Sequence, residues 1–487
     1  MSTTSLHVGI IGGGIGGLAA AIAIARSGAK VTLLEAAKEL GEIGAGIQMY
    51  PNISRFLIRW GVSDILGSQL VTHKYCNTWF GSELVAHSDP QWMVKATGFP
   101  WWVVRRDHLL SALKESAEKH GAEVLIATRI VEIDDGGKGV AVTSEDGRKF
   151  SFDFVVGADG LKSIIRNHIH PGVMPVAPSK SAAYRMVLSY DRIFEAVPEA
   201  RTYLHDSMDI WAGPNGYILT YPIAGGKEMN LVTSFCKEEY VTRMEDVDID
   251  EFRGYYKDFH PIIRKIIDIA GYTKRWPLLQ MPRMKTWSNE KKNLVLLGDA
   301  AHCMQNHMGQ GAATAIEDSA CLGRLLNEVV RGVLTLPEAV DLYEKQRIPR
   351  AWTKQQVSLV SGHLIMDANR RGERSMATTA EVKAYDSNGS VVTPMPPAYR
   401  SWELAFNPYT VPGVYFHDAE GEADNAVCDY LQKKGEVDEY SSLAKGLSDK
   451  WWGYVHNNGI NLDIPVSEHN GSRELDEEDY KKYGRGL

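Results

Sequence analysis

Cysteine is scarce in this chain of 487 residues, and the few that occur are scattered. The five are Cys76, Cys236, Cys303, Cys321 and Cys428, and no two of them form a Cys-x-x-Cys pair. An odd, dispersed set argues against a disulfide framework, and thiolate zinc sites need closely spaced ligands. The His-Glu-x-x-His spacing of many metalloenzymes is also missing. We therefore expect reduced thiols and no metal site.

Long apolar runs and basic clusters are absent as well. No run reaches the ~18 residues that a membrane-spanning helix requires, and the opening Met1-Ser2-Thr3-Thr4-Ser5 lacks the basic region of a signal peptide. We expect no membrane association and a cytoplasmic location. The formal net charge is −8, and without a basic stripe a nucleic-acid partner is not expected. A small polar or anionic substrate stays compatible, because the local charge of a site matters more than the total.

What the chain does have is a glycine-rich turn near its start. An apolar run over 6–11 predicts a buried strand, and an Ala-rich stretch over 18–25 predicts a helix. Between them, Gly12 permits a tight bend, Gly14 admits a pyrophosphate to the backbone, and Gly17 allows close packing of helix on strand. A second strand over 31–34 ends in Glu35, which is placed to accept hydrogen bonds from a ribose. The alternative, a glycine turn without a ligand, is disfavoured because the strand, the helix and the acidic residue all occur at the spacing of the dinucleotide-binding fingerprint.

A second glycine-rich run follows a later strand, and a turn that contains Asp159 lies between the two runs in the sequence. The run is Gly298-Asp299-Ala300-Ala301-His302, and a predicted helix over 310–330 begins with Gln310-Gly311-Ala312. The amino end of a helix carries unpaired N–H donors and about half a positive charge. Asp299, Gly311 and Ala312 are therefore candidates to hold the flavin half of a dinucleotide. Asp159, after the strand predicted over 152–156, would sit at the same sheet edge.

The middle of the chain changes to short strands. We expect strands over 123–133 and 140–144, and then a meander of strands over 183–189, 201–205, 208–212, 217–221 and 230–235. A parallel-type strand resumes over 293–297. The predicted fold class is α/β: a Rossmann-like dinucleotide-binding domain, an inserted and mostly antiparallel β-sheet domain, and a C-terminal extension. The acidic tail could cover the site or a dimer contact, but a solvated extension is favoured.

These motifs together resemble the single-component FAD-dependent aromatic hydroxylases, the group A flavoprotein monooxygenases, and most of all the salicylate hydroxylase branch. The resemblance rests on the two glycine runs, on Gly157-Ala158-Asp159-Gly160, and on Arg106-Asp107-His108-Leu109, whose arginine in the family contacts the flavin. It implies bound FAD, with NADH or NADPH and dioxygen as co-substrates. A C4a-hydroperoxyflavin then attacks an electron-rich phenolic ring, so the protein must favour the phenolate and exclude water.

The resemblance also suggests how the chain is divided. FAD-binding parts are expected at 1–75, 102–178 and 286–360, substrate-domain segments at 76–101 and 179–285, and the C-terminal extension at 361–487. The chain is expected to be a monomer or a homodimer.

Six residues are candidates for the substrate end of the site. Arg185 could pair with a carboxylate or phenolate, although a surface salt bridge is an equal alternative. Tyr217 and Tyr221 share one face of a strand, and such a pair is often core packing. His302 and His307 could relay a proton, but a structural role is the better interpretation of His302. Asn306 stands where salicylate hydroxylases usually carry Pro, and Tyr217 where they commonly carry His.

The favoured interpretation of function is decarboxylative hydroxylation of a phenolic acid of the salicylate or 4-hydroxybenzoate type. Two alternatives stay open. One is hydroxylation of a larger phenolic metabolite without decarboxylation. The other is a flavoprotein with no oxygenase activity, either one that uses FAD structurally or as a redox sensor or a reductase that acts on an alkene.

Overall fold

The computed structural model describes residues 6–41, 45–72, 74–88, 93–94, 97–204, 207–371, 384–385, 391–392 and 414–434. Its centre is a five-stranded parallel sheet in the order β18-β11-β1-β2-β7. The strands are β1 (His7–Ile11), β2 (Lys30–Leu34), β7 (Glu123–Leu125), β11 (Phe154–Gly157) and β18 (Leu294–Leu296). Nearly all their residues outside β7 are buried, as expected of a parallel sheet covered on both faces. Glu35, Asp159 and Asp299 follow three of these strands and so lie toward the same edge.

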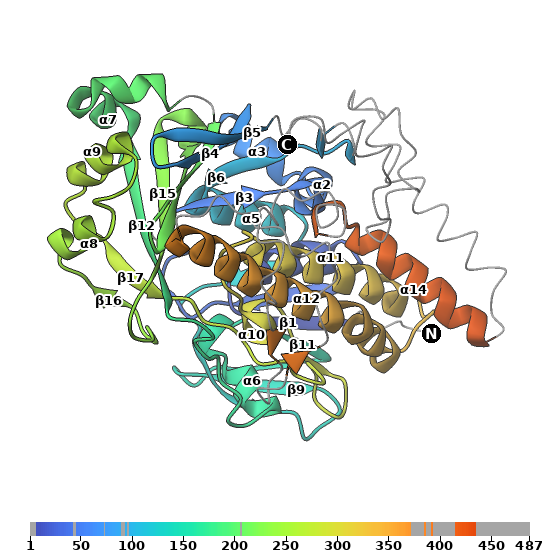
Figure 1. The fold of residues 1–487 in the computed structure, drawn as a ribbon. Helices are drawn as coiled ribbons and strands as arrows, with labels where there is room; N and C mark the ends of the chain where they lie inside the picture. The colour runs from blue at the N-terminus through green and yellow to red at the C-terminus, as the bar shows by residue number, and fades with distance from the viewer. Residues whose placement is uncertain are drawn as a thin grey trace.

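Helices from distant parts of the chain cover this sheet (Figure 1). They are α1 (Ile15–Ala25), α5 (Arg106–Lys119) and α11 (Gly311–Val330), joined by α2 (Pro51–Arg59), α3 (Val62–Leu66), α6 (Ile164–Ile169) and α10 (Asp299–His302). α1 and α11 pack very closely, since a Cβ built on Gly323 would lie 2.6 Å from the Cβ of Ala23. The two glycine-rich turns therefore begin neighbouring helices.

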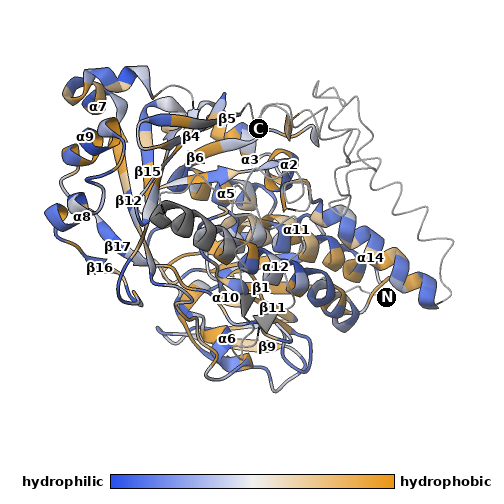
Figure 2. Ribbon diagram, in the orientation of Figure 1, coloured by the Kyte–Doolittle hydropathy of each residue, from blue (hydrophilic) through white to orange (hydrophobic). Residues whose placement is uncertain are grey.

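A second sheet of eight strands stands beside the first, with the order β16-β17-β12-β15-β14-β13-β4-β5. Its strands are β4 (Tyr75–Phe80), β5 (Glu83–Ser88), β12 (Ser181–Ser189), β13 (Ser207–Gly213), β14 (Gly216–Ile223), β15 (Glu228–Cys236), β16 (Glu245–Asp246) and β17 (Lys274–Pro277). All its pairings are antiparallel except that of β13 with β4. α7 (Tyr190–Ala196), α8 (Ile249–Tyr255) and α9 (Pro261–Ile269) lie against its outer side. Figure 2 shows apolar and polar residues mixed around α9, which buries four isoleucines under the sheet.

Smaller sheets and turns make up the rest of the described fold. β8 (Ile130–Asp134), β9 (Val140–Ser144) and β10 (Lys149–Phe152) form a three-stranded sheet, while β3 (Gly46–Met49) pairs with β6 (Trp102–Arg105) and β19 (Ala384–Tyr385) with β20 (Val391–Val392). Single 3₁₀ turns occupy η1 (Gly67–Gln69), η2 (Gly160–Lys162), η3 (Pro198–Thr202) and η4 (Ala224–Gly226).

Three expectations about local structure are wrong. The strand over 123–133 is two strands in different sheets, because Ala127 adopts a positive φ of 50° that interrupts an extended chain. The strand expected over 201–205 is not formed, since η3 occupies 198–202. The expected meander is also incomplete, because β12 pairs with β15 and β17 rather than with β13.

The C-terminal part of the described chain is packed, not solvated. α12 (Leu336–Arg371) crosses from the parallel-sheet side toward the eight-stranded sheet, and α14 (Ala419–Lys434) lies against α11 and α12 (Figure 1). Ala419, Ala423, Val427 and Leu431 belong to the main core. The expectation of a solvated acidic tail is wrong for 418–434, and the rest of the tail lies outside the described residues. None of the described helices is both long and apolar enough to cross a membrane.

Candidate active site

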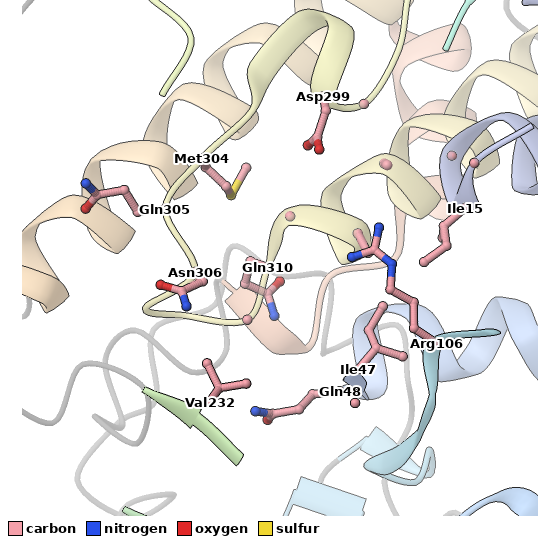
Figure 3. A pocket seen from close by; sticks show the side chains of 18 of the residues that line it. Ile15, Ile47, Gln48, Arg106, Val232, Asp299, Met304, Gln305, Asn306 and Gln310 are labelled. Atoms are coloured by element: carbon pink, nitrogen blue, oxygen red, sulfur yellow. The ribbon is translucent and has the colours of Figure 1, made fainter. Parts of the chain in front are cut away.

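A cavity of about 410 Å³ lies between the parallel sheet and the eight-stranded sheet (Figure 3). Both glycine-rich runs reach it: Gly14 and Gly16 from the first, and Gly298, Asp299, Gly311 and Ala312 from the second. Arg185, Tyr217 and Tyr221 line it from the eight-stranded sheet, and Arg106 lines it from the start of α5. Segments that are far apart in sequence therefore converge on one space, as the motifs predicted.

The first glycine turn has room for a ligand at one position only. Gly12 has a φ of +108°, and a Cβ on Gly17 would lie 1.9 Å from the Gly12 carbonyl oxygen, so both glycines are required by the backbone itself. A Cβ on Gly14 would meet nothing within 4 Å. The open space at Gly14, beside the amino end of α1, fits a pyrophosphate held by backbone N–H groups.

Glu35 closes the same turn. Its carboxylate accepts hydrogen bonds from the backbone N–H of Gly13 at 2.5 Å and of Ala37 at 2.6 Å. The acid is thus held beside the glycine turn, where the fingerprint expects a ribose. Each carboxylate oxygen keeps a further lone pair for such a ligand.

The second glycine run presents a carboxylate and a helix end to the cavity. Asp299 is exposed and points into the space, as Figure 3 shows. α11 begins at Gly311, one residue later than expected, and no side chain caps its first turn. Its amino end therefore offers free N–H groups at Gly311 and Ala312, which fits the electron-rich edge of a flavin ring.

Arg106 and Asp159 differ in their access to the cavity. Arg106, the first residue of α5, lies in the lining, where burial and the nearby Arg185 lower its pKa. Asp159 stands behind the lining residues Ala158 and Gly160, and its Oδ2 accepts hydrogen bonds from the N–H groups of Ile164 and Ile165. Asp159 thus shapes the turn beside the cavity, although burial raises the pKa of its carboxyl.

Arg185 is an unpaired cation in the cavity wall. Its guanidinium lies 5.5 Å from the ring centre of Trp276, and among the described residues it forms no ion pair with a carboxylate. The alternative of a surface salt bridge therefore does not hold. Burial lowers the pKa of Arg185 and raises that of the neighbouring Tyr221, so the tyrosine stays a neutral phenol.

Tyr217 and His307 form a buried pair at the other end of the lining. The Tyr217 hydroxyl lies 2.9 Å from His307 Nδ1, and the two side chains are 6% and 8% exposed. Burial raises the pKa of Tyr217 to about 12, so the tyrosine stays a neutral phenol, and the tautomer of His307 sets which of the two groups donates. The neighbouring Asn306 lines the cavity, and its buried Oδ1 has no hydrogen-bond partner in the described part of the chain.

His302 takes no part in the lining. Its Nε2 lies 2.5 Å from Asp318 Oδ2, and both side chains are almost fully buried. Burial opposes ionisation of Asp318, but His302 and Arg347 hold the pKa of this carboxyl below its usual range. The structural interpretation of His302 is the one that the geometry favours.

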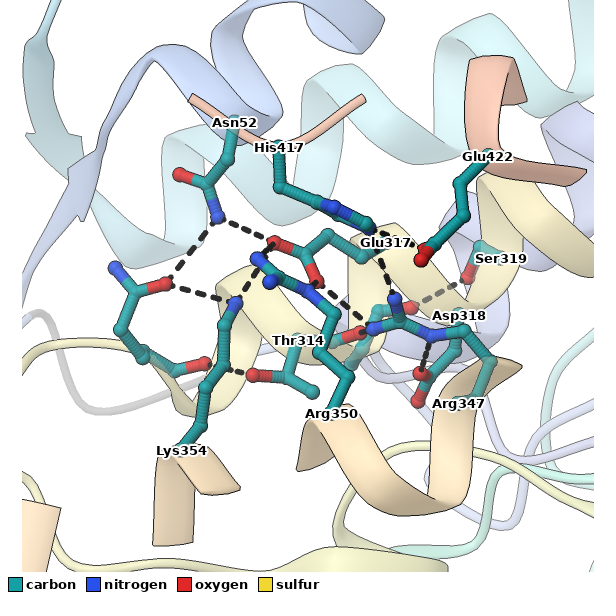
Figure 4. Close-up of polar contacts among 12 residues, drawn as sticks. Asn52, Thr314, Glu317, Asp318, Ser319, Arg347, Arg350, Lys354, His417 and Glu422 are labelled. Atoms are coloured by element: carbon teal, nitrogen blue, oxygen red, sulfur yellow. Dashed lines mark hydrogen bonds and ion pairs between the residues drawn. The ribbon is translucent and has the colours of Figure 1, made fainter. Parts of the chain in front are cut away.

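Sequence reasoning missed several polar residues around the cavity. Gln48, Gln305 and Gln310 line it, and of these only Gln310 lies in a motif that the sequence made visible. Behind Gln310, the buried Glu317 binds Arg347, Arg350 and Lys354 (Figure 4). The partners come from α11 and α12, and no spacing rule relates residues that meet only through tertiary packing.

A C-terminal clasp, residues 414–424, supports the wall next to the cavity. Tyr415 stacks on Tyr50 with ring centres 4.2 Å apart, and the Tyr50 hydroxyl donates to Gln48 Oε1 at 2.6 Å. Asp418 pairs with Arg55 at 3.1 Å, and Glu420 with Arg59 at 2.6 Å. The clasp is therefore linked to the lining residue Gln48 through Tyr50.

Comparison with known proteins identifies the family of this chain. A family model described as an FAD binding domain matches residues 5–358. The FAD-dependent monooxygenase OpS4 of Beauveria bassiana is 30% identical over 87% of this chain and 97% of that protein. A 3-hydroxybenzoate 6-hydroxylase of Klebsiella oxytoca is 32% identical over 72% of this chain and 87% of that protein.

This chain belongs to the FAD-dependent aromatic hydroxylases. It is an FAD-dependent monooxygenase, and the expected recognition and enzyme class are confirmed. A salicylate hydroxylase of Pseudomonas putida is 30% identical over 74% of this chain and 86% of that protein.

Solved structures confirm the fold. CtdE in complex with FAD and a substrate superposes with a TM-score of 0.71 at 20% identity, over 91% of this chain and all of that one. A salicylate hydroxylase substrate complex gives a TM-score of 0.68 at 20% identity, over 87% of this chain and 98% of that one. The predicted fold class, a Rossmann-like core with an antiparallel sheet domain, is confirmed.

Proposed function

We propose that this enzyme uses NADH or NADPH and dioxygen to hydroxylate a small phenolic acid. One oxygen atom enters the ring, the other leaves as water, and the nicotinamide is oxidised. The observation that carries the proposal is Arg185, a cation without a carboxylate partner among the described residues, in the same cavity as the Tyr217–His307 pair. A phenolic acid has the two polar groups that this wall is able to bind.

Arg185 is proposed to bind the substrate carboxylate. A guanidinium forms strong charge-assisted hydrogen bonds with a carboxylate, and Trp276 against its flat face restrains the side chain. Tyr221, beside Arg185 and buried, is proposed to pack against the aromatic ring. Together they would fix the ring between the sheet and the cofactor.

The Tyr217–His307 pair is proposed to take the phenolic proton. In the His307 tautomer protonated at Nε2, Nδ1 accepts from the Tyr217 hydroxyl, whose oxygen keeps lone pairs for a proton from the substrate. Transfer of that proton to Tyr217, with the tyrosine proton passing to His307 Nδ1, would leave a phenolate. Asn306, in the cavity lining, is proposed to orient the substrate hydroxyl by donating from Nδ2 to its oxygen.

The cofactor side of the cavity is proposed to hold FAD with the pyrophosphate at Gly14, in a turn that Gly12 and Gly17 shape, and with Glu35 at the adenosine ribose. Asp299, Arg106 and the N–H groups of Gly311 and Ala312 would hold the flavin half. Asp159 would act indirectly, by shaping the adjacent turn. When bound, FAD supplies electron transfer from the nicotinamide and activation of dioxygen.

Salicylate and 4-hydroxybenzoate, with loss of carbon dioxide, are the proposed substrate type. A larger phenolic metabolite, hydroxylated without decarboxylation, is the second candidate. It stays a candidate because OpS4, which matches 87% of this chain, is named only as an FAD-dependent monooxygenase, whereas the hydroxybenzoate and salicylate hydroxylases match 72% and 74% of it.

The test uses the purified, FAD-loaded protein with NADH or NADPH, oxygen and a panel of hydroxybenzoates. Accelerated nicotinamide oxidation, with a product heavier by one oxygen atom or with carbon dioxide released, is the expected result. Stimulation by neutral phenols alone would exclude the carboxylate anchor. Oxidation of the nicotinamide without any oxygenated product, across acids and larger phenols, would favour a flavoprotein that is not an oxygenase on these compounds.

A further inference from the structure

Gln310 places a buried carboxamide at the amino end of α11. The residue immediately precedes the helix, is 1% exposed, and lies in the cavity lining beside Asn306 (Figure 3). Its Nε2 has no hydrogen-bond partner in the part of the chain that the structure describes. A buried amide nitrogen without a partner is costly in a folded protein, so its presence here indicates an acceptor supplied by a ligand.

The other end of the same carboxamide is held. Gln310 Oε1 accepts hydrogen bonds from Lys354 Nζ at 3.0 Å and from Asn52 Nδ2 at 3.2 Å. Both nitrogens act as donors, so the oxygen of the carboxamide must face them and the nitrogen must face away. The direction of the amide is therefore determined by its partners.

Lys354 and Asn52 are themselves positioned by Glu317. Glu317 Oε1 accepts from Lys354 Nζ and from Asn52 Nδ2, each at 2.7 Å (Figure 4). Burial lowers the pKa of Lys354 to about 7. A neutral amine still carries two N–H bonds, one for Glu317 and one for Gln310, so the arrangement survives in either protonation state.

We propose that Lys354 is a positioning residue that turns the Gln310 carboxamide so that its Nε2 donates a hydrogen bond to the bound flavin. This proposal rests on FAD binding in the cavity. An N–H donor beside the ring stabilises the negative charge that reduction places on it, and it adds to the effect of the α11 amino end. The pair would therefore raise the reduction potential of the bound cofactor.

The experiment measures the reduction potential of protein-bound FAD by equilibration with a reference dye. The variants are Gln310→Met, Lys354→Met, the double variant and Gln310→Glu. Each single methionine variant is expected to make reduction about tenfold less favourable, which is ~30 mV for a two-electron couple. The double variant is expected to match one single variant, because both changes remove the same hydrogen bond.

Whether the effects of Gln310→Met and Lys354→Met add in the double variant distinguishes a positioning role of Lys354 from an effect of its charge alone. If Lys354 acted only through its charge, its effect would add to that of Gln310→Met, and the proposal would be overturned. Gln310→Glu keeps the oxygen that faces Lys354 and replaces only the donor, so it preserves the fold if a methionine variant does not. An unchanged potential in Gln310→Glu would also overturn the proposal.

Arg350→Met is the matched control. Arg350 binds the same Glu317 carboxylate at 2.7 Å and has no contact with Gln310 among those described. Removing it takes one positive charge from the cluster and leaves the carboxamide in place. Its reduction equilibrium is expected to stay within about twofold of the native protein, and a shift as large as that of Lys354→Met would argue against a specific role for Lys354.

Discussion

The two ends of the cavity are built from different kinds of group. The cofactor end is largely backbone: glycine turns at Gly14 and Gly298 and the free N–H groups of α11. The substrate end is side chains from separate elements, with Arg185 on β12, Tyr217 and Tyr221 on β14, and His307 in a loop. A backbone cradle depends on a few glycines in sequence, whereas a side-chain wall depends on how sheets and helices pack. The first is therefore visible in the sequence, and the second is visible only in the folded structure.

The largest effects are expected from substitutions of the glycines at the cofactor end. One substitution should prevent folding, and another should prevent FAD binding alone. Gly17→Ala places a Cβ 1.9 Å from a backbone oxygen, so the expected result is loss of folded protein. Gly14→Val meets no atom within 4 Å, so the chain should fold and yet bind FAD at least about 100-fold more weakly, or ~2.7 kcal/mol. Circular dichroism and flavin absorbance after FAD addition distinguish the two. A yellow, FAD-saturated Gly14→Val protein would contradict the assigned cradle.

Tyr217→Phe should impair substrate hydroxylation and leave FAD binding unchanged. The variant loses the hydroxyl that bonds to His307, so kcat for phenolic substrates is expected to fall about 100-fold. FAD content and the rate of flavin reduction without substrate should match the native enzyme. Turnover at the native rate would show that the phenolic proton leaves by another route.

Arg185→Met tests the anion anchor and is expected to be milder. Loss of a charge-assisted hydrogen bond of about 1.5–3 kcal/mol should raise KM for hydroxybenzoates by roughly 10- to 100-fold. Neutral phenols of the same size provide the control and should change little. An equal rise in KM for acids and neutral phenols would remove the proposed role.

The smallest effect at neutral pH is expected from a substitution of His417 in the clasp, which should change how the stability of the fold depends on pH. Burial and the neighbouring Arg350 lower the pKa of His417 to about 4. Because this folded-state pKa lies below the ordinary value of about 6.5, the unfolded chain binds the proton first and stability falls as the pH drops from 6.5 to 4. The loss is on the order of 3 kcal/mol, measured as urea unfolding across that range. His417→Gln should flatten the pH dependence, and an unchanged slope in this variant would place its cause elsewhere.

The same contrast explains what could be predicted from sequence. Gly12, Gly14, Gly17 and Asp299 follow apolar strands, so local patterns sufficed to place them at one sheet edge. The ends of β7 and β8 could not be predicted, because the positive φ at Ala127 is not typical of alanine.

The long-range partners were equally hidden from sequence reasoning. Lys354 and Gln310 are 44 residues apart and meet only through the packing of α12 on α11. Arg185 was visible as a charged residue in a strand, but whether it had a carboxylate partner could be decided only in three dimensions.

One consequence of the clasp concerns how this protein could be divided. The family match ends at residue 358, yet Asp418, Glu420 and Asp424 supply the counter-charges of Arg55, Arg59 and Arg324 inside that region. A shortened protein that stopped at the family boundary would lose the carboxylates bound to the buried Arg55 and Arg59, at a cost of several kcal/mol each, whereas Arg324 would keep Glu328. The region that the family model covers therefore depends for its stability on a later part of this chain.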